Sequence, residues 1–323
     1  MKALTYYRDG SPDVLQIEEL PKPMPTADQI LIKVQTVSLN GSDKENLIGK
    51  PFYTRFAGLR KPSNPILGSD IAGTVESVGT NVTAFKPGDE LFGEIPGYHG
   101  GLAEYVCTDG QTLAHKPAGL TFAEAAAIPQ AAIIAWRGIE QKGQVQSGQQ
   151  VLINGAGGSA GSFAIQLAKH KGAEVTAVDN GGKLNFMRAL GADHVLDYTK
   201  VNFTQTGKQY DLILDVIGYR SAFAYRRALK PNGTYYFTGG SFATLLQTLL
   251  LGPLLKGRAN KKVTFLAVPQ NREDLLAVTE LCVASKIRPI IDRRYALDEA
   301  AEAFRYLAAG HGYGKVIIDV AES

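Results

Sequence analysis

The chain has 323 residues, of which 45% are apolar and 20% are charged, a composition typical of folded globular proteins and not of disordered or fibrous ones. The formal net charge is only +3, and the one basic cluster, residues 256–262, has no interleaved aromatic side chains. We therefore expect no nucleic-acid partner. The N-terminal residues have no apolar signal core, and no stretch reaches the ~18 apolar residues of a membrane span. Because Cys107 and Cys282 are too far apart in sequence for a metal clip or a disulfide framework, we expect a cytoplasmic protein.

The first 120 residues are typical of a small β domain. Short apolar runs at 29–35, 71–78 and 90–92 are separated by turn residues, including Lys86-Pro-Gly-Asp89, and they predict strands of a barrel-like domain. From about residue 122, helical patterns alternate with buried-type strands, which indicates a parallel α/β sheet. A chain of this length is expected to form about two domains, and this change of pattern is the boundary we predict.

The second region predicts a doubly wound parallel sheet, in which ligands bind beyond the carboxyl ends of the strands. The predicted strands are residues 150–154, 174–179, 194–196, 211–215, 233–238 and 263–267. The predicted helices are residues 158–170, 183–190, 221–229 and 272–285. A helix at 297–307 and a strand at 315–319 follow, and they are less clearly part of this sheet.

A glycine-rich turn follows the first of these strands. It has the pattern Ala156-x-Gly158-x-x-Gly161, a variant of the dinucleotide-binding fingerprint, between a predicted strand and a predicted helix. Residues without bulky side chains let the backbone approach a pyrophosphate, and Gly161 lets the helix pack closely on its strand. FAD also binds to such turns, but flavin-type sequences usually carry the turn at the chain start. We predict a nicotinamide dinucleotide site.

Asp179 ends the next strand, about twenty residues after the turn, where a ribose hydroxyl is expected. A carboxylate there accepts hydrogen bonds from the ribose and repels a 2′-phosphate, which favours NADH. Asn180 and Lys183 are close enough in sequence to favour a phosphate instead. Alternatively, Asp179 only caps the following turn.

Over essentially its whole length, the chain resembles the medium-chain dehydrogenase/reductase superfamily, and within it the zinc-free quinone oxidoreductase and enoyl reductase branch. The glycine turn carries this resemblance together with residues 38–43, 65–73, 85–89, 100–105, 125–129, 190–195 and 310–315. The implied fold is an α/β chain with a GroES-like β-barrel catalytic domain, residues 1–122 completed by 290–323, and a Rossmann doubly wound parallel sheet domain, residues 123–289. The family favours NADPH.

Zinc-using relatives carry metal ligands at positions where this chain has Asn40, Ser69 beside Asp70, and a residue near Gln130. Zinc needs three or four good nitrogen or sulfur donors, and the five histidines show no ligand-like spacing. We therefore expect no zinc. Without a Lewis acid, the resemblance implies hydride transfer from NAD(P)H to a quinone, or to the activated C=C of an enal or enone. A zinc-type alcohol dehydrogenase and a non-catalytic dinucleotide-binding redox sensor are the alternatives.

The resemblance places Asn40 beside the nicotinamide or the substrate oxygen, and it is our first catalytic candidate. Asp43 is the second, although a structural role, in which it holds that loop, is favoured. Tyr53 and Tyr98 are candidate proton donors, and Glu45 stands where the family has a tyrosine. The implied cofactor contacts are Gly158, Ser159, Ala160, Asp179, Asn180, Lys183, Tyr198, Val216, Ile217, Gly239, Gly240, Phe265, Leu266, Ala267 and, from the tail, Lys315. An ordinary exposed lysine is the alternative for Lys315.

Residues 242–255 form a leucine-rich segment between the fifth and sixth strands of the second region. Such a segment caps a substrate pocket, packs against a second subunit, touches a membrane surface as a peripheral contact, or forms a buried helix. Because relatives pair through this region, we expect a homodimer.

Overall fold

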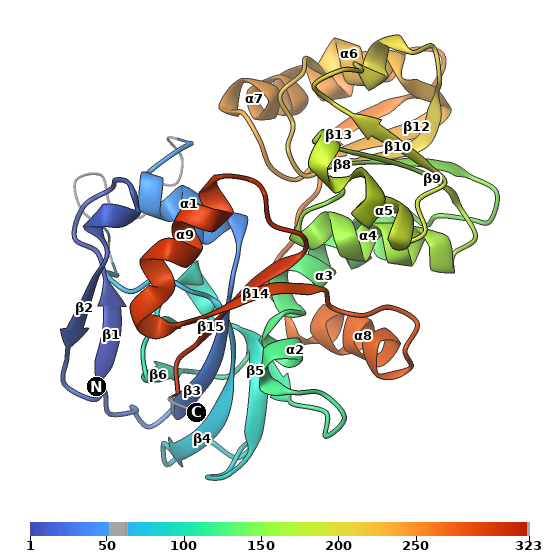
Figure 1. Cartoon of the computed structure of the whole chain (residues 1–323). Helices are drawn as coiled ribbons and strands as arrows, with labels where there is room; N and C mark the ends of the chain where they lie inside the picture. Colours follow the sequence, from blue (N-terminus) through green and yellow to red (C-terminus); the bar gives the residue numbers. More distant parts are fainter. Residues whose placement is uncertain (52–61, 63, 322–323) are drawn as a thin grey trace. The chain divides into compact units, whose positions relative to one another are not determined.

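The computed structural model describes residues 1–51, 62 and 64–321 (Figure 1). These residues form two compact units. The first contains residues 1–130, 270–283 and 289–323, and the second contains residues 131–269 and 284–288. Helix α8 (Arg272–Val283) therefore clusters with the first unit, although the sequence placed this segment in the second domain. Its first residue explains this, because Arg272 donates a hydrogen bond to the Gly110 carbonyl (2.6 Å) and its guanidinium lies over the Phe85 ring.

The first unit is built on a seven-stranded sheet with the order β14-β15-β3-β4-β5-β7, and β6 also pairs with β3. Its strands are β3 (Ile30–Leu39), β4 (Asp70–Val78), β5 (Glu90–Glu94), β6 (Tyr105–Thr108), β7 (Leu113–His115), β14 (Ile291–Ala296) and β15 (Lys315–Asp319). A separate hairpin joins β1 (Lys2–Thr5) and β2 (Gln16–Glu19), and the other helices of this unit are α1 (Gly41–Ile48), α2 (Phe122–Ala126) and α9 (Ala300–Ala308). Apolar side chains of β3, β4 and β15 pack with α9 in one core.

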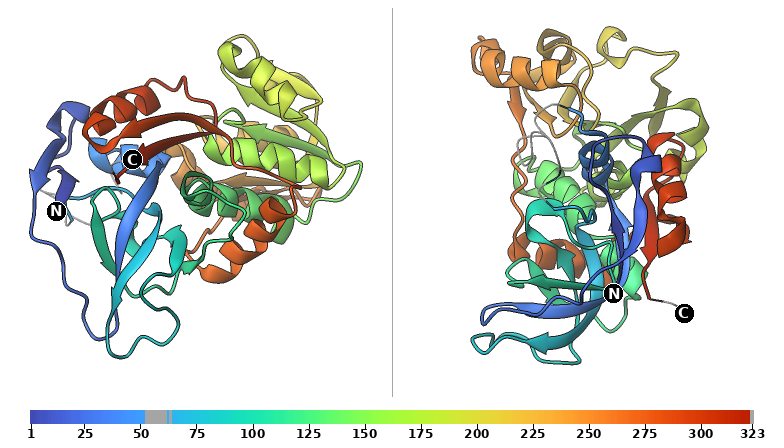
Figure 2. Two further views of the ribbon diagram at one scale, coloured as in Figure 1. Left: turned by 60° about the horizontal axis from the view of Figure 1, so that its bottom comes forward. Right: turned by 90° about the vertical axis from the view of Figure 1, so that its left-hand side faces the viewer.

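The C-terminal segment returns to the first unit. Strand β15 pairs antiparallel with β3, with Val316 opposite Leu39, and β3 pairs with β4, with Ser38 opposite Asp70. Figure 2 shows the red C-terminal segment against the blue β3. This pairing brings three strand ends together: the start of β15, the end of β3 and the start of β4. The candidate site of this unit lies at that end of the sheet.

The second unit contains a six-stranded parallel sheet with the order β10-β9-β8-β11-β12-β13. Its strands are β8 (Gln150–Asn154), β9 (Glu174–Asp179), β10 (His194–Asp197), β11 (Tyr210–Asp215), β12 (Leu229–Phe237) and β13 (Lys262–Phe265). The helices are α3 (Pro129–Trp136), which begins in the first unit, then α4 (Ser159–His170), α5 (Leu184–Ala189), α6 (Ala222–Arg227) and α7 (Phe242–Leu251). Figure 1 shows α4 and α5 on one face of the sheet and α6 and α7 on the other. The strand order reverses between β8 and β11, where doubly wound sheets bind their ligands.

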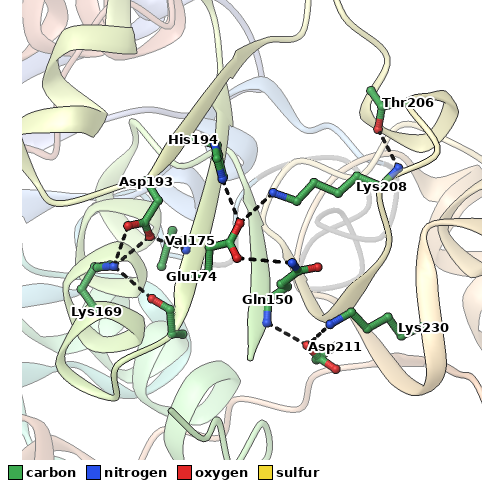
Figure 3. A network of polar contacts seen from close by, with 11 residues as sticks. Gln150, Lys169, Glu174, Val175, Asp193, His194, Thr206, Lys208, Asp211 and Lys230 are labelled. Atoms are coloured by element: carbon green, nitrogen blue, oxygen red, sulfur yellow. Dashed lines mark hydrogen bonds and ion pairs between the residues drawn. The ribbon is translucent and has the colours of Figure 1, made fainter. Parts of the chain in front are cut away.

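The amino ends of five of these strands, β8 to β12, are linked by the polar network of Figure 3. Glu174 at the start of β9 accepts hydrogen bonds from Lys208 (3.0 Å) and Gln150 (3.3 Å), and it contacts the His194 ring (2.8 Å). Lys208 and His194 hold the pKa of the Glu174 carboxyl at about 2. Parallel strands bring their amino ends to one edge, so this network fastens the edge opposite the glycine turn.

The leucine-rich segment forms α7 and the short turn of helix after it, and it is not a buried helix. Thr244 and Thr248 face inward, whereas Leu249, Leu250 and Leu254 are between 53% and 79% exposed. The Ser241 hydroxyl caps the start of the helix by accepting a hydrogen bond from the Thr244 N–H, and the Thr244 hydroxyl donates to the Arg220 carbonyl. No helix in the described part of the chain is long and apolar enough to span a membrane.

Candidate functional site: a dinucleotide turn and a buried lysine cluster

The glycine turn in the second unit is held to the end of strand β9. Gly155, in the left-handed region (φ +81°), and Ala156 both donate their N–H groups to the Val178 carbonyl, at 2.9 and 3.0 Å. A Cβ atom on Gly161 would lie 2.2 Å from the Gly155 oxygen, so only glycine lets α4 start this close to the turn. Ala160 lies in the first turn of α4, at the positive end of the helix dipole, which is a favourable place for the negative charge of a pyrophosphate.

Asp179 is already engaged by this turn. Its Oδ2 atom accepts a hydrogen bond from the Gly157 N–H (2.9 Å), its Oδ1 atom accepts one from the Asn180 N–H (2.8 Å), and the Lys183 ammonium lies 3.8 Å away. The residue is only 4% exposed. The carboxylate therefore fixes the glycine turn, whereas the N-cap of the short helical turn that follows β9 is Asn180, whose side chain accepts the Gly182 N–H (3.0 Å). The sequence signal for the role of Asp179 is the small Gly157, whose missing side chain leaves room for Lys183.

The other predicted cofactor residues of the second unit lie in the segments that follow the strands. Ile217 and Tyr198 are 38% and 50% exposed, whereas Lys183 and Leu266 are buried. The Gly240 backbone has φ +132°, and a Cβ atom there would lie 2.2 Å from the Gly218 oxygen, so this loop needs glycine. The remaining predicted positions lie in the same segments: Asn180 after β9, Val216 after β11, Gly239 after β12, and Phe265 and Ala267 at the end of β13.

The sequence did not anticipate the environment of Asp215 at the end of β11. This buried carboxylate accepts hydrogen bonds from the Asn154 side chain (2.7 Å), the Ile217 N–H (3.1 Å) and the Tyr235 hydroxyl (3.0 Å). It therefore ties together the carboxyl ends of β8, β11 and β12 beside the glycine turn. Aspartate at the end of a buried apolar strand is the signal that was available.

In the first unit, Lys315 is completely buried and is not an exposed lysine. Its Nζ atom donates to the Asn40 Oδ1 atom (2.6 Å) and lies 3.2 Å from an Asp70 carboxylate oxygen. Asn40 is 2% exposed and is the N-cap of α1. Asp43, the second catalytic candidate, accepts hydrogen bonds from the Asn40 N–H (2.7 Å) and the Gly68 N–H (3.1 Å), so it holds the loop.

Gln130 extends this cluster to Glu94. The Gln130 N–H donates to the Asp70 carboxylate at 3.3 Å, and its side-chain Nε2 donates to the Glu94 carboxylate at 2.7 Å. The sequence did not single out Glu94, although an acid directly after an apolar strand segment was a usable signal. In this region, three buried polar groups, the Ser38 Oγ, the Asn40 Nδ2 and the Ser69 Oγ, have no hydrogen-bond partner among the residues with described positions.

Burial controls the protonation of this cluster. It raises the pKa of the Glu94 carboxyl to about 8 and that of Asp43 to about 7. Burial also raises the pKa of Asp70, and the Lys315 charge is the largest effect opposing this. The pKa of Tyr98 rises to about 12 through burial and the Glu94 charge, so its hydroxyl keeps its proton at neutral pH. Tyr53, the other tyrosine candidate, lies outside the described residues.

The residues at the zinc-ligand positions of relatives do meet here, but their chemistry does not fit zinc. Asn40, Ser69 and Gln130 offer neutral oxygen or amide groups and no thiolate or imidazole. The Lys315 ammonium contacts Asn40 and Asp70 and would repel a dication. Between residues 1 and 321, apart from 52–61 and 63, no group of three or more His, Cys, Asp or Glu side chains is arranged to hold a metal ion.

Comparisons with known proteins agree with this architecture. A family model described as an alcohol dehydrogenase GroES-like domain matches residues 26–118, and one described as a zinc-binding dehydrogenase matches residues 190–318. The chain is 35% identical to a 2-methylene-furan-3-one reductase of Solanum lycopersicum, over 98% of the chain and 79% of the relative. It is 32% identical, with the same coverage, to a chloroplastic NADPH-dependent alkenal/one oxidoreductase of Arabidopsis thaliana.

A solved structure of the quinone oxidoreductase from Coxiella burnetii has a TM-score of 0.89 with this chain at 30% identity, over 99% of both chains. These matches extend over both units, and the second unit contains the parallel sheet that the resemblance implied. The chain therefore belongs to the medium-chain dehydrogenase/reductase superfamily, in its branch of quinone oxidoreductases and enone reductases.

Proposed function

We propose that this protein reduces quinones or the activated C=C bond of enals and enones, with NADPH as the preferred hydride donor and without zinc. The observation that carries the proposal is the Lys315 ammonium at the positions where zinc-using relatives hold their metal. Without a Lewis acid to stabilise an alkoxide, alcohol oxidation is disfavoured, whereas a conjugated acceptor is already electrophilic. The names of the alkenal/one oxidoreductase and quinone oxidoreductase relatives support the same acceptor class.

When bound, NADPH would supply the hydride for the β-carbon of an enone, and negative charge would then develop on the carbonyl oxygen. The chain binds and orients the reactants. The turn at residues 155–161 and the first turn of α4 accommodate the pyrophosphate, and the Asn40 Nδ2–H donates a hydrogen bond to the carbonyl oxygen as negative charge develops there. A proton then reaches the α-carbon from solvent or from a neutral donor such as the Tyr98 hydroxyl, which balances the reaction.

The surroundings of Asp179 support the proposed preference for NADPH. Its oxygens are engaged by Gly157 and Asn180, and the nearby Lys183 ammonium balances its charge. The carboxylate is thus poorly placed to accept ribose hydroxyls, and its repulsion of a 2′-phosphate is weakened. We expect Lys183→Met to raise the Kd of NADPH and to leave that of NADH nearly unchanged, as measured by quenching of cofactor fluorescence.

Steady-state kinetics test the proposed reaction. The wild-type protein, treated with a chelator, is assayed with NADPH and NADH against 1,4-benzoquinone, alkenals and cyclic enones, and in the reverse direction with simple alcohols. Asn40→Ala is expected to lower kcat by about 10²-fold. The matched control is Asn81→Ala, which changes an exposed side chain paired with Asp28 in the same unit. Tight NADPH binding without any turnover would favour a redox sensor, and loss of alcohol oxidation on chelation would favour a zinc enzyme.

We also propose that the protein is a cytoplasmic homodimer that pairs through the face formed by α7 and the edge strand β13. Strand β13 is the last strand of the sheet, and its Phe265 side chain is 41% exposed. Leu246, Leu249 and Leu250 of α7 are also exposed. An apolar face beside an unpaired strand edge suits a second copy of the chain. Leu250→Glu is expected to give monomers in analytical ultracentrifugation, whereas Leu276→Glu, at an exposed leucine of α8, is not. Wild-type monomers that sediment with lipid vesicles would instead favour a peripheral membrane contact.

A further inference from the structure

Strand register fixes Lys315 next to Asn40. Val316 lies opposite Leu39 across the β15–β3 pair, so the residue before Val316 and the residue after Leu39 are neighbours at the same end of the two strands. The next strand brings Asp70 there, since it lies opposite Ser38. The resulting contacts join side chains that are 275 and 245 residues apart in sequence, and all three residues are at most 2% exposed.

The ammonium determines the orientation of the Asn40 carboxamide. A lysine Nζ only donates hydrogen bonds, so the amide atom 2.6 Å from it is the oxygen. The amide nitrogen is then on the other side of the group, where it makes no hydrogen bond to any residue in the described ranges. A buried donor without a partner is uncommon in folded proteins and calls for a functional explanation.

The Asp70 carboxylate is an alternative hydrogen-bond acceptor for the Asn40 amide nitrogen. The Asn40 side chain lies close enough to Asp70 to help lower the pKa of its carboxyl, although Nδ2 does not reach hydrogen-bond geometry with it. Without the ammonium, rotation of the amide would let Nδ2 donate to that carboxylate. Lys315 opposes this rotation in two ways, because it holds the amide oxygen and neutralises the carboxylate.

We propose that Lys315 is a positioning residue that holds the Asn40 carboxamide with its N–H donor presented to the carbonyl oxygen of the acceptor. The inference rests on the proposed function and adds a role for a residue that contacts neither acceptor nor cofactor. It differs from the sequence-based interpretation, in which Lys315 contacts the cofactor directly.

The test compares four variants in kcat, in the KM of an enone, and in the Kd of NADPH. Lys315→Met is expected to lower kcat by at least about 10-fold, with the Kd of NADPH within about twofold of wild type. Asn40→Asp keeps an acceptor for the ammonium but has no donor, so kcat is expected to fall further, by about 10²-fold. Lys116→Met is the matched control, because Lys116 in the same unit is also nearly buried and is paired with Glu90 (3.0 Å); its kcat should stay at the wild-type value.

The fourth variant, Lys315→Met with Asp70→Asn, separates positioning from charge neutralisation, because it removes both charges but leaves a side-chain oxygen towards which the Asn40 amide can rotate. If Lys315 only neutralises Asp70, removing both charges restores kcat; if it positions Asn40, kcat stays low while thermal melting shows a folded protein. An unchanged kcat in Lys315→Met, or a recovered kcat in the double variant, overturns the proposal. A more than 10-fold rise in the Kd of NADPH with kcat retained would place Lys315 at the cofactor. Absence of any turnover by the wild-type protein would instead refute the proposed function, and this inference with it.

Discussion

Two glycines of the turn are expected to respond differently to the same added methyl group. A Cβ atom on Gly161 would lie 2.2 Å from the Gly155 oxygen and 2.5 Å from the Ala156 Cα, both backbone atoms. The start of α4 must therefore move by about 1 Å or more, because unstrained contacts of this kind need over 3 Å. Overpacking of this kind costs typically 1–3 kcal/mol, so about 3 kcal/mol is expected for Gly161→Ala.

Gly158→Ala adds its methyl group where the protein has room. The Cβ atom would lie 3.4 Å from the Gly155 oxygen, an ordinary contact, and the backbone (φ −91°, ψ −171°) suits alanine. We expect a stability change within about 1 kcal/mol. The methyl group stands where the backbone is expected to approach the pyrophosphate, so the Kd of NADPH should rise more than about 10-fold, which is at least about 1.4 kcal/mol.

Thermal unfolding and fluorescence titration with NADPH check both variants, and each is the control for the other. At about 2–4 °C per kcal/mol for a unit of this size, Gly161→Ala should lower Tm by about 6–12 °C, whereas Gly158→Ala should lower it by only a few degrees. If Gly158→Ala destabilises the protein as much as Gly161→Ala, or if it binds NADPH normally, the assignment of the turn is wrong.

Three further changes probe the buried and bridging carboxyls. Asp179→Ser removes the acceptor that fixes the turn, so the Kd values of NADH and NADPH should both rise, about fivefold or more; weaker binding of NADH alone would place this carboxylate at the ribose. The Glu94 pKa is raised from 4.5 to about 8 in the folded protein, so its contribution to stability is present below pH 4.5 and is lost as the pH rises through about 8. Urea denaturation of Glu94→Gln should therefore show a smaller loss of stability between pH 6 and pH 9 than the wild type. The Glu174 pKa is lowered to about 2, so its contribution is present above pH 4.5 and is lost as the pH falls towards 2; because the side chain is 38% exposed, Glu174→Gln should remove less than about 1 kcal/mol of acid sensitivity, and salt should reduce the effect.

The strands of the second unit could be predicted from the sequence because they are continuous apolar runs ended by turn residues. The predicted bounds of β8 and β9 are those observed, and so are those of β15 in the first unit. Strand β12 is the exception, since it begins at Leu229, where a helix was predicted to end. The Pro-Asn-Gly stretch that follows reads as a turn, with Asn232 at φ +63°, and the pairing of β11 with β12 shifts its register there.

The orientation of polar side chains could not be read from the sequence. The pattern placed Asp179 at the end of the second strand, but which donor its carboxylate meets depends on the Gly157 N–H, 22 residues earlier in the chain. The contact of Lys315 with Asn40 depends on the register of β15 against β3. Sequence periodicity predicts which face of a strand is buried, but it does not specify which residue of a distant strand lies opposite.

An ammonium cannot do what a metal ion does at the same place, and this difference limits the chemistry of the site. A zinc ion polarises a substrate oxygen by binding it directly. Lys315 is fully buried and directs its donors at Asn40 and Asp70, so in the proposed mechanism it acts on an acceptor only through the hydrogen bond that Asn40 donates. Such a bond stabilises charge that develops on an oxygen already conjugated to the reacting carbon, but it is too weak to generate an alkoxide from an alcohol at neutral pH. The exchange of metal ligands for a lysine cluster therefore favours acceptors whose own π system carries the charge, which is the property that quinones and enones share.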